Sequence, residues 1–213
     1  MINVLLVEDH ELVRLGIKRL LSDVATINVI GEASCGEDAI SFVRSHEVTP
    51  DIVLMDVNMP GIGGLEATRR LLQLQPQIKI IIVTVYAEEP FPSRLLQVGA
   101  KGYLTKGCCV EEMTNAIKTV HSGERYIAPE VAQRLALTLL PGGSSAPFES
   151  LSDRELQVML MLTKGQRTQD ISKKLCLSPK TVSTYRHRLY QKLDVQGDVE
   201  LTHLALRYGI IES

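Results

Sequence analysis

Short apolar runs alternate with amphipathic segments over the first 122 residues. Five runs are mostly apolar and have the length of buried strands, at residues 2–7, 27–31, 51–55, 78–84 and 101–104. Between and after them, hydrophobic residues recur at helical spacing over 11–21, 36–45, 64–73, 89–98 and 109–122. Strands and helices that alternate in this way predict an α/β fold, a doubly wound domain with a five-stranded parallel sheet.

The pattern changes beyond this domain. Residues 128–140 have the spacing of one further helix, and the stretch from Pro141 to Pro147 is rich in small, flexible residues. No strand pattern follows, and helices are expected over 152–164, 167–175, 179–193 and 198–208. The sequence therefore predicts an α/β domain over 1–124, a helical and flexible linker over 125–149, and an all-α domain over 150–213.

Two of the expected helices carry start signals. Ser152 is followed three residues later by Glu155, which is the spacing of a capping box. Ser178 precedes Pro179, which places a good N-cap residue before a proline at the first helical position. These signals strengthen the expectation of an all-helical second domain.

Composition and charge add limits to this picture. The chain has 213 residues, 45% of them hydrophobic, which suffices for two packed cores. Its four cysteines lack the spacing of a zinc site, and its N-terminus lacks the pattern of a signal peptide. No apolar run approaches the roughly 18 residues of a membrane span. We therefore expect a cytoplasmic protein with no membrane partner.

The net charge of −2 conceals a split between the two parts of the chain. Residues 1–150 carry 13 basic and 18 acidic side chains, whereas residues 151–213 carry 10 basic and 7 acidic ones. A modest basic excess is weak support for nucleic-acid binding by itself.

Three carboxylates follow apolar strands of the α/β part. Asp56 ends the run 51–55, and Glu8 and Asp9 end the run 2–7. Chemistry in open α/β sheets collects at the carboxyl ends of the strands, so these side chains are expected to meet. A cluster of carboxylates suits a hard cation such as Mg²⁺.

Two further polar residues belong to the same sheet edge. Thr84 ends the run 78–84, and Lys106 follows the short strand at 101–104. A phosphoryl group on Asp56 would need its oxygens neutralised by a cation, an ammonium group and a hydroxyl donor. The set therefore predicts a phosphoacceptor site.

With these residues in order, residues 2–122 resemble the receiver domain of bacterial two-component response regulators. The resemblance implies that Asp56 accepts a phosphoryl group from a sensor histidine kinase or a phosphotransfer domain. It also implies that the backbone carbonyl of Asn58 joins Glu8, Asp9 and Asp56 around Mg²⁺. Thr84 and Tyr103 would form the switch pair, with the hydroxyl moving toward the phosphate and the ring turning inward.

Two other functions remain open from the residues alone. A phosphohydrolase of the haloacid dehalogenase type also uses an Mg²⁺-bound aspartate at a strand end, but it needs an acid two residues later. That position holds Asn58, which cannot titrate. The other alternative is a phosphorylation-independent DNA-binding regulator whose receiver-like domain serves only as an interaction scaffold; the intact set of pocket residues speaks against it.

The helical part contains two short helices, a tight turn at 176–178 and a third, basic helix. A basic helix of about 15 residues after such a turn can enter the major groove of DNA. Residues 150–210 resemble the LuxR/FixJ-type helix-turn-helix. By position, this resemblance places Ser183, Thr184 and His187 at the bases, and it places beside the DNA backbone Lys180, Thr181, Tyr185, Arg186 and Arg188.

Both parts together make the chain similar to response regulators of the NarL/FixJ family. The stretches 90–96, 106–107 and 175–182 are most similar to the GacA/UvrY/LetA group of global regulators. The resemblance implies a transcription regulator rather than an enzyme, with a tripartite hybrid sensor kinase as phosphodonor. It also implies dimerisation on phosphorylation, binding to double-stranded promoter DNA, and control of small regulatory RNA genes.

Overall fold

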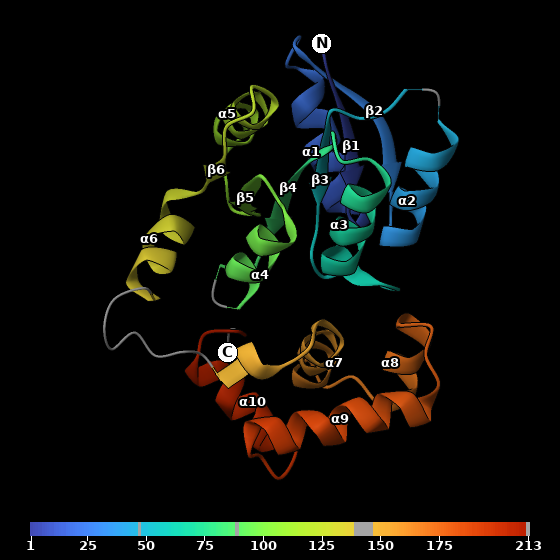
Figure 1. Cartoon of the computed structure of the whole chain (residues 1–213), viewed down its shortest axis with the longest axis vertical. Helices are drawn as coiled ribbons and strands as arrows, with labels where there is room; N and C mark the ends of the chain where they lie inside the picture. The colour runs from blue at the N-terminus through green and yellow to red at the C-terminus, as the bar shows by residue number, and fades with distance from the viewer. Residues whose placement is uncertain (47, 88–89, 139–146, 212–213) are drawn as a thin grey trace. The chain divides into compact units, whose positions relative to one another are not determined.

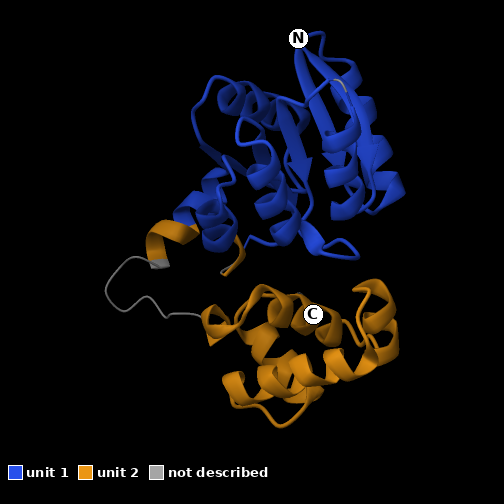
Figure 2. Ribbon diagram, turned by 45° about the vertical axis from the view of Figure 1, so that its right-hand side comes forward, with its two compact units in different colours: residues 1–87, 92–133 blue, residues 88–91, 134–213 orange. Residues whose placement is uncertain are grey.

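A computed structural model of the protein describes residues 1–46, 48–87, 90–138 and 147–211. The chain divides into two compact units, shown in different colours in Figure 2. The first comprises Met1–Ala87 and Pro92–Gln133, and the second Glu88–Phe91 and Arg134–Ser213. The flexible segment predicted at 141–147 lies outside the described residues except for Pro147.

The first unit contains a six-stranded parallel sheet with strand order β2-β1-β3-β4-β5-β6 (Figure 1). Its strands are β1 (Ile2–Val7), β2 (Ile27–Ala33), β3 (Ile52–Met55), β4 (Lys79–Thr84), β5 (Gly102–Thr105) and β6 (Tyr126–Ile127). The α/β fold is confirmed, but the predicted number of five strands was wrong. The two residues of β6 are too few to show a period, and they pair with the edge that β5 would otherwise leave open.

The helices that lie wholly or partly in the first unit are close to their predicted positions: α1 (Glu11–Ser22), α2 (Gly36–Ser45), α3 (Gly63–Leu74), α4 (Phe91–Val98), α5 (Val110–His121) and α6 (Pro129–Thr138). Helix α4 begins at Phe91 rather than at 89, so Pro92 falls in its first turn, where a proline costs no hydrogen bond. Helices α1 and α5 pack against each other on one face of the sheet, and α2 packs against α3 on the other (Figure 1).

The register of the central strands brings their carboxyl ends to one edge of the sheet. Val7 pairs with Met55, so the residues that follow β1 and β3 are neighbours. The ladder continues one step past the strands, because the Asp56 N–H donates to the Val7 carbonyl oxygen at 2.9 Å. In the same way, the Lys106 N–H donates to the Thr84 carbonyl oxygen at 2.9 Å. Backbone pairing therefore holds four predicted functional positions at this edge: Glu8, Asp56, Thr84 and Lys106.

The second unit is helical. After a 3₁₀ turn at Pro147–Ser150 it contains α7 (Asp153–Thr163), α8 (Thr168–Lys174), α9 (Pro179–Leu193) and α10 (Asp198–Arg207). Both predicted helix starts are confirmed, since Ser152 and Glu155 form a reciprocal capping box and the Ser178 hydroxyl accepts the Thr181 N–H.

Helix α7 is buried on most sides, whereas α9 and α10 each contribute one face to the interior of this unit. Val182, Leu189 and Leu193 of α9 are buried, as are Leu201 and Ala205 of α10. Packing within the unit therefore accounts for the apolar face of α10. Among the described residues, no helix is both long and apolar enough to cross a bilayer.

Candidate functional site

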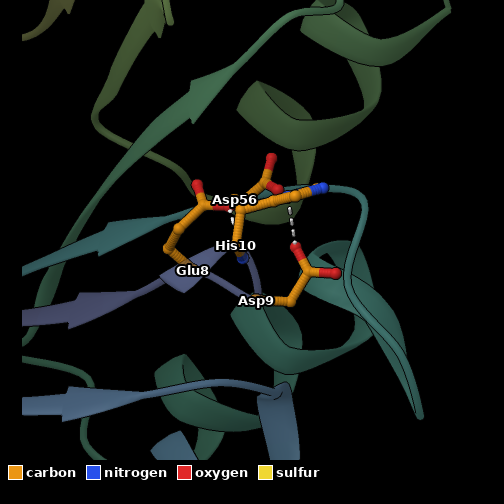
Figure 3. Close-up of side chains that lie close together, drawn as sticks. All are labelled: Glu8, Asp9, His10 and Asp56. Atoms are coloured by element: carbon orange, nitrogen blue, oxygen red, sulfur yellow. Dashed lines mark hydrogen bonds and ion pairs between the residues drawn. The ribbon is translucent and has the colours of Figure 1, made fainter. Parts of the chain in front are cut away.

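Three carboxylates gather at the carboxyl edge of the sheet, and we call Glu8, Asp9 and Asp56 the acidic pocket (Figure 3). Glu8 follows β1 and is 2% exposed, and Asp56 follows β3 and is 3% exposed. The Asp56 side chain accepts a hydrogen bond from the Val57 N–H, at 2.7 Å from Oδ1. Two nearly dehydrated carboxylates this close together require a positive charge between them.

Lys106 supplies that charge in the structure. Its Nζ lies 2.6 Å from Glu8 Oε2 and 3.0 Å from Asp56 Oδ2, so one ammonium group bridges both buried carboxylates. Lys106 directly follows β5, which β4 separates from β3 in the sheet, so its long side chain spans one intervening strand to reach this position. The predicted approach of Lys106 to Asp56 is thus present in the geometry.

Burial raises the pKa of Asp56, because the charged carboxylate loses its hydration, and the charge of Glu8 adds to the rise. Lys106 opposes this effect without cancelling it. For Lys106 itself, burial acts to lower the pKa, but the charges and hydrogen bonds of Asp56 and Glu8 outweigh it and the pKa is raised. Lys106 therefore stays an ammonium ion, and any additional cation would favour the charged form of Asp56.

The donor set fits a divalent cation. Asp9 Oδ1 is a buried oxygen that accepts no hydrogen bond, although His10 Nδ1 lies 3.0 Å away. One ligand atom from each of Glu8, Asp9, His10 and Asp56 lies within 4.8 Å of the others. A buried oxygen that accepts no hydrogen bond costs free energy, which a bound cation would recover.

The predicted switch residues lie in the interior beside the pocket. Thr84 is fully buried at the end of β4. Its hydroxyl oxygen accepts a hydrogen bond from the Tyr86 N–H, with 3.4 Å between Oγ1 and the nitrogen. Tyr103 is also fully buried, and its hydroxyl donates to the Tyr86 carbonyl oxygen at 2.5 Å. The ring of Tyr103 therefore already occupies an inward position. Asn58 lies half-buried in the loop after β3.

Three residues near the pocket were not predicted from the sequence. His10 faces two of the carboxylates, and Tyr86 lies close enough that burial and the charge of Asp56 raise its pKa to about 12. Glu37 of α2 accepts the Ile62 N–H at 3.0 Å and so holds the loop that follows Asp56. His10 and Tyr86 each lie within two residues of a predicted site residue, which was the available signal; Glu37 had none.

Helix α9 presents a polar face at the surface of the second unit. Five of the eight residues predicted to contact DNA are exposed on it: Lys180, Ser183, Thr184, His187 and Arg188. Thr181 and Tyr185 are half-buried, and the Thr181 hydroxyl bonds with that of Ser178 at 2.8 Å. An exposed basic helix after a tight turn has the form that a major-groove reader needs.

Arg186 differs from the other predicted DNA contacts because it is engaged within the unit. Its guanidinium lies 2.7 Å from Asp198 Oδ2 of α10 and donates to the Tyr190 hydroxyl at 2.6 Å. Tyr190 also bonds to Asp198. These three side chains tie α9 to the start of α10.

Comparison with known proteins agrees with this organisation. Residues 4–118 match the response regulator receiver domain, and residues 149–205 match the luxR family of bacterial regulatory proteins. The chain is 56% identical over 211 residues to the response regulator UvrY of Escherichia coli strain K12, covering 99% of this chain and 96% of that protein. It is 55% identical to the response regulator GacA of Pseudomonas aeruginosa, covering 100% and 99%.

A solved structure resembles the chain over both units. Promoter-bound RcsB of Salmonella enterica, with the phosphomimetic BeF₃⁻, matches with a TM-score of 0.70 at 23% identity, covering 96% of this chain and 98% of RcsB. At that identity the likeness concerns the fold alone.

A parallel α/β sheet with an acidic pocket at its carboxyl edge, joined to a helix-turn-helix, defines a two-component regulator that binds DNA. The chain belongs to the response regulators with a LuxR-type helix-turn-helix, and it is most similar to UvrY and GacA among the relatives named here. The predicted family and fold class are confirmed.

Proposed function

We propose that Asp56 is the phosphoacceptor and that its phosphorylation controls promoter binding. A carboxylate oxygen of Asp56 would attack the phosphorus of a phosphohistidine on a sensor histidine kinase or phosphotransfer domain. The P–N bond breaks as the O–P bond forms, and the leaving imidazole nitrogen takes a proton. The observation that carries this proposal is the buried Asp56 carboxylate paired with the Lys106 ammonium at 3.0 Å.

We assign Mg²⁺ as the cofactor. Glu8, Asp9 and Asp56 would hold it through carboxylate oxygens, together with the backbone carbonyl of Asn58. When bound, the ion neutralises negative charge on the phosphoryl oxygens and the pocket. Lys106, already at the Asp56 carboxylate, would stabilise a phosphoryl oxygen from the other side.

We assign Thr84 and Tyr103 as the switch pair. Thr84 would turn its hydroxyl toward the phosphoryl group, and the inward ring of Tyr103 would fill the space beside it. Such a switch needs a free-energy difference of a few kcal/mol between two states. The switched state would form a homodimer, and its two helix-turn-helix domains would bind the two halves of an inverted repeat in DNA.

The DNA-binding set supports recognition of double-stranded promoter DNA by α9. We propose that Ser183, Thr184 and His187 face the bases, and that Lys180 and Arg188 meet the phosphates, with Thr181 and Tyr185 beside them. Arg186 would reach the backbone only by leaving Asp198. Small regulatory RNA genes are the proposed targets.

The proposed domain limits are those that the sequence predicts. We propose a receiver domain at 1–124, a linker at 125–149 and a helix-turn-helix domain at 150–213. The protein would act in the cytoplasm as a regulator without enzymatic turnover, because Asn58 cannot supply the acid that a phosphohydrolase needs at that position.

The first test concerns the phosphoacceptor. The full chain, Asp56→Asn and Asp23→Asn are incubated with acetyl phosphate and Mg²⁺, and the intact mass is measured. Asp23 is a suitable control because its side chain is 66% exposed and lies at the end of α1. We expect one added phosphoryl group on the parent and on Asp23→Asn. An adduct on Asp56→Asn would contradict the assignment of Asp56.

The second test concerns DNA. Duplexes are selected from a randomised library with the phosphorylated chain, and affinity is measured against salt concentration. Lys180→Met should reduce the slope of log affinity against log salt by about 1, as expected for one lost phosphate contact. Lys118→Met, on an exposed position of α5 in the other unit, should leave the slope unchanged. Equal slopes for both variants would refute the assigned interface.

A further inference from the structure

His10 occupies the N-cap position of α1 without capping the helix. N-cap positions favour Ser, Thr, Asp and Asn, whose side chains accept a backbone N–H of the first turn. The His10 side chain makes no such bond. Its ring turns instead to the acidic pocket, where Nδ1 lies 3.0 Å from Asp9 Oδ1 and 3.2 Å from Glu8 Oε1 (Figure 3).

These distances have the length expected between two ligands of one metal ion. Two ligand atoms that each lie about 2.1 Å from a metal and at a right angle are about 3.0 Å apart. The two oxygens that face Nδ1 are not those that contact Lys106, which binds Glu8 Oε2 and Asp56 Oδ2. A nitrogen ligand can therefore act on one side of the pocket while Lys106 remains on the other.

We propose that His10 is a metal ligand that lets the acidic pocket bind divalent transition metal ions such as Ni²⁺, Co²⁺ or Zn²⁺. The inference rests on the proposed role of the pocket as a cation site. Carboxylates alone suit Mg²⁺, whereas imidazole nitrogen favours the later transition metals. Asp9 Oδ1, a buried oxygen that accepts no hydrogen bond, would complete the coordination beside His10 Nδ1. His10 thus determines which metals compete with Mg²⁺.

The same geometry also allows another interpretation, in which a protonated Nδ1 donates a hydrogen bond to the carboxylates. The variant His10→Asn distinguishes a metal ligand from a hydrogen-bond donor. The Asn amide reaches about as far as Nδ1 and keeps a hydrogen-bond donor, and Asn is a favoured N-cap residue, so the variant should fold. It has no basic nitrogen lone pair for a metal. His121→Asn is the matched control, since His121 is exposed at the end of α5.

The experiment measures Ni²⁺ and Mg²⁺ binding to the reduced full-length protein by calorimetry, with Ni²⁺ absorption as a second readout. We expect the Ni²⁺ dissociation constant to rise about tenfold or more in His10→Asn and to stay unchanged in His121→Asn. The Mg²⁺ affinity should remain within about twofold in both variants, because Mg²⁺ has little preference for nitrogen.

Equal Ni²⁺ affinity in the parent and in His10→Asn would overturn the role of His10. Retained phosphorylation by acetyl phosphate with Mg²⁺ would in that case leave the proposed function intact. If neither ion binds and Asp56 accepts no phosphoryl group, both the metal site and the proposed function fail. The two failures are therefore distinguishable.

Discussion

Gly64 tests how closely helix α3 must approach the strand that carries Asp56. A Cβ added at Gly64 would lie 2.0 Å from the Asp56 carbonyl oxygen and 2.8 Å from Val57 Cα. Both atoms belong to the backbone, so no side-chain rotation can relieve the contact. The Gly64 N–H also donates to the Val57 carbonyl oxygen at 3.0 Å, which fixes the helix start at this distance.

The expected cost of Gly64→Ala is the difference between two effects. Overpacking a rigid site costs about 1–3 kcal/mol, and a backbone contact of 2.0 Å belongs at the upper end of that range. Alanine recovers up to about 1 kcal/mol through its higher helix propensity. We therefore expect a net loss of about 2 kcal/mol.

Gly16→Ala is the matched control. Gly16 lies inside α1, and an added Cβ would have no neighbour within 4 Å, so this variant should gain about 0.5–1 kcal/mol. Stability is measured by urea unfolding followed by circular dichroism. Gly64→Ala should also be phosphorylated more slowly by acetyl phosphate, because its strain acts on the Asp56 backbone. If Gly64→Ala were as stable as Gly16→Ala, the reasoning would be refuted.

Three further predictions concern other parts of the structure. The pKa of Asp56, followed by NMR of its carboxyl carbon, should lie above 3.8, and Lys106→Met should raise it further because Lys106 lowers it; a downward shift would contradict this. Cys176 has a φ of 53°, in the left-handed region that is strained for a residue with a Cβ. Cys176→Gly should therefore raise the free energy of unfolding of the second unit by about 0.5–1 kcal/mol in urea, and a lower stability of this variant would contradict the strain. Arg186→Met should cost about 0.5–1 kcal/mol, with no added loss when Asp198→Asn is combined with it.

The central part of the fold could be predicted because buried parallel strands leave a strong pattern. Residues 51–55 are almost entirely apolar and end in a carboxylate, and all four residues of β3 are buried. Adjacent strand ends then follow from the parallel topology. On this basis Glu8, Asp56 and Lys106 could be placed at one edge of the sheet, where Lys106 Nζ contacts both carboxylates.

Contacts set by side-chain direction could not be predicted in the same way. The sequence contains His10 beside two acids, but its ring could equally have pointed to solvent, and only the structure shows Nδ1 at the carboxylates. The same holds for Glu37, which bonds to Ile62 across a separation of 25 residues. Strand β6 escaped for another reason, since two residues cannot display a period.

The position of Arg186 on the inner face of α9 could have been predicted from the helical spacing, although the family resemblance placed this residue beside the DNA backbone. Val182, Arg186, Leu189 and Leu193 recur at spacings of four, three and four, so Arg186 lies on the stripe of α9 that is otherwise buried. Helical geometry thus places it toward α10, where Asp198 meets it. The exposed stripe runs through Lys180, Ser183, Thr184, His187 and Arg188 on the opposite side. We therefore expect DNA binding to depend on this narrower set, with base specificity carried by Ser183, Thr184 and His187, and we expect Arg186 to act by holding α10 against α9.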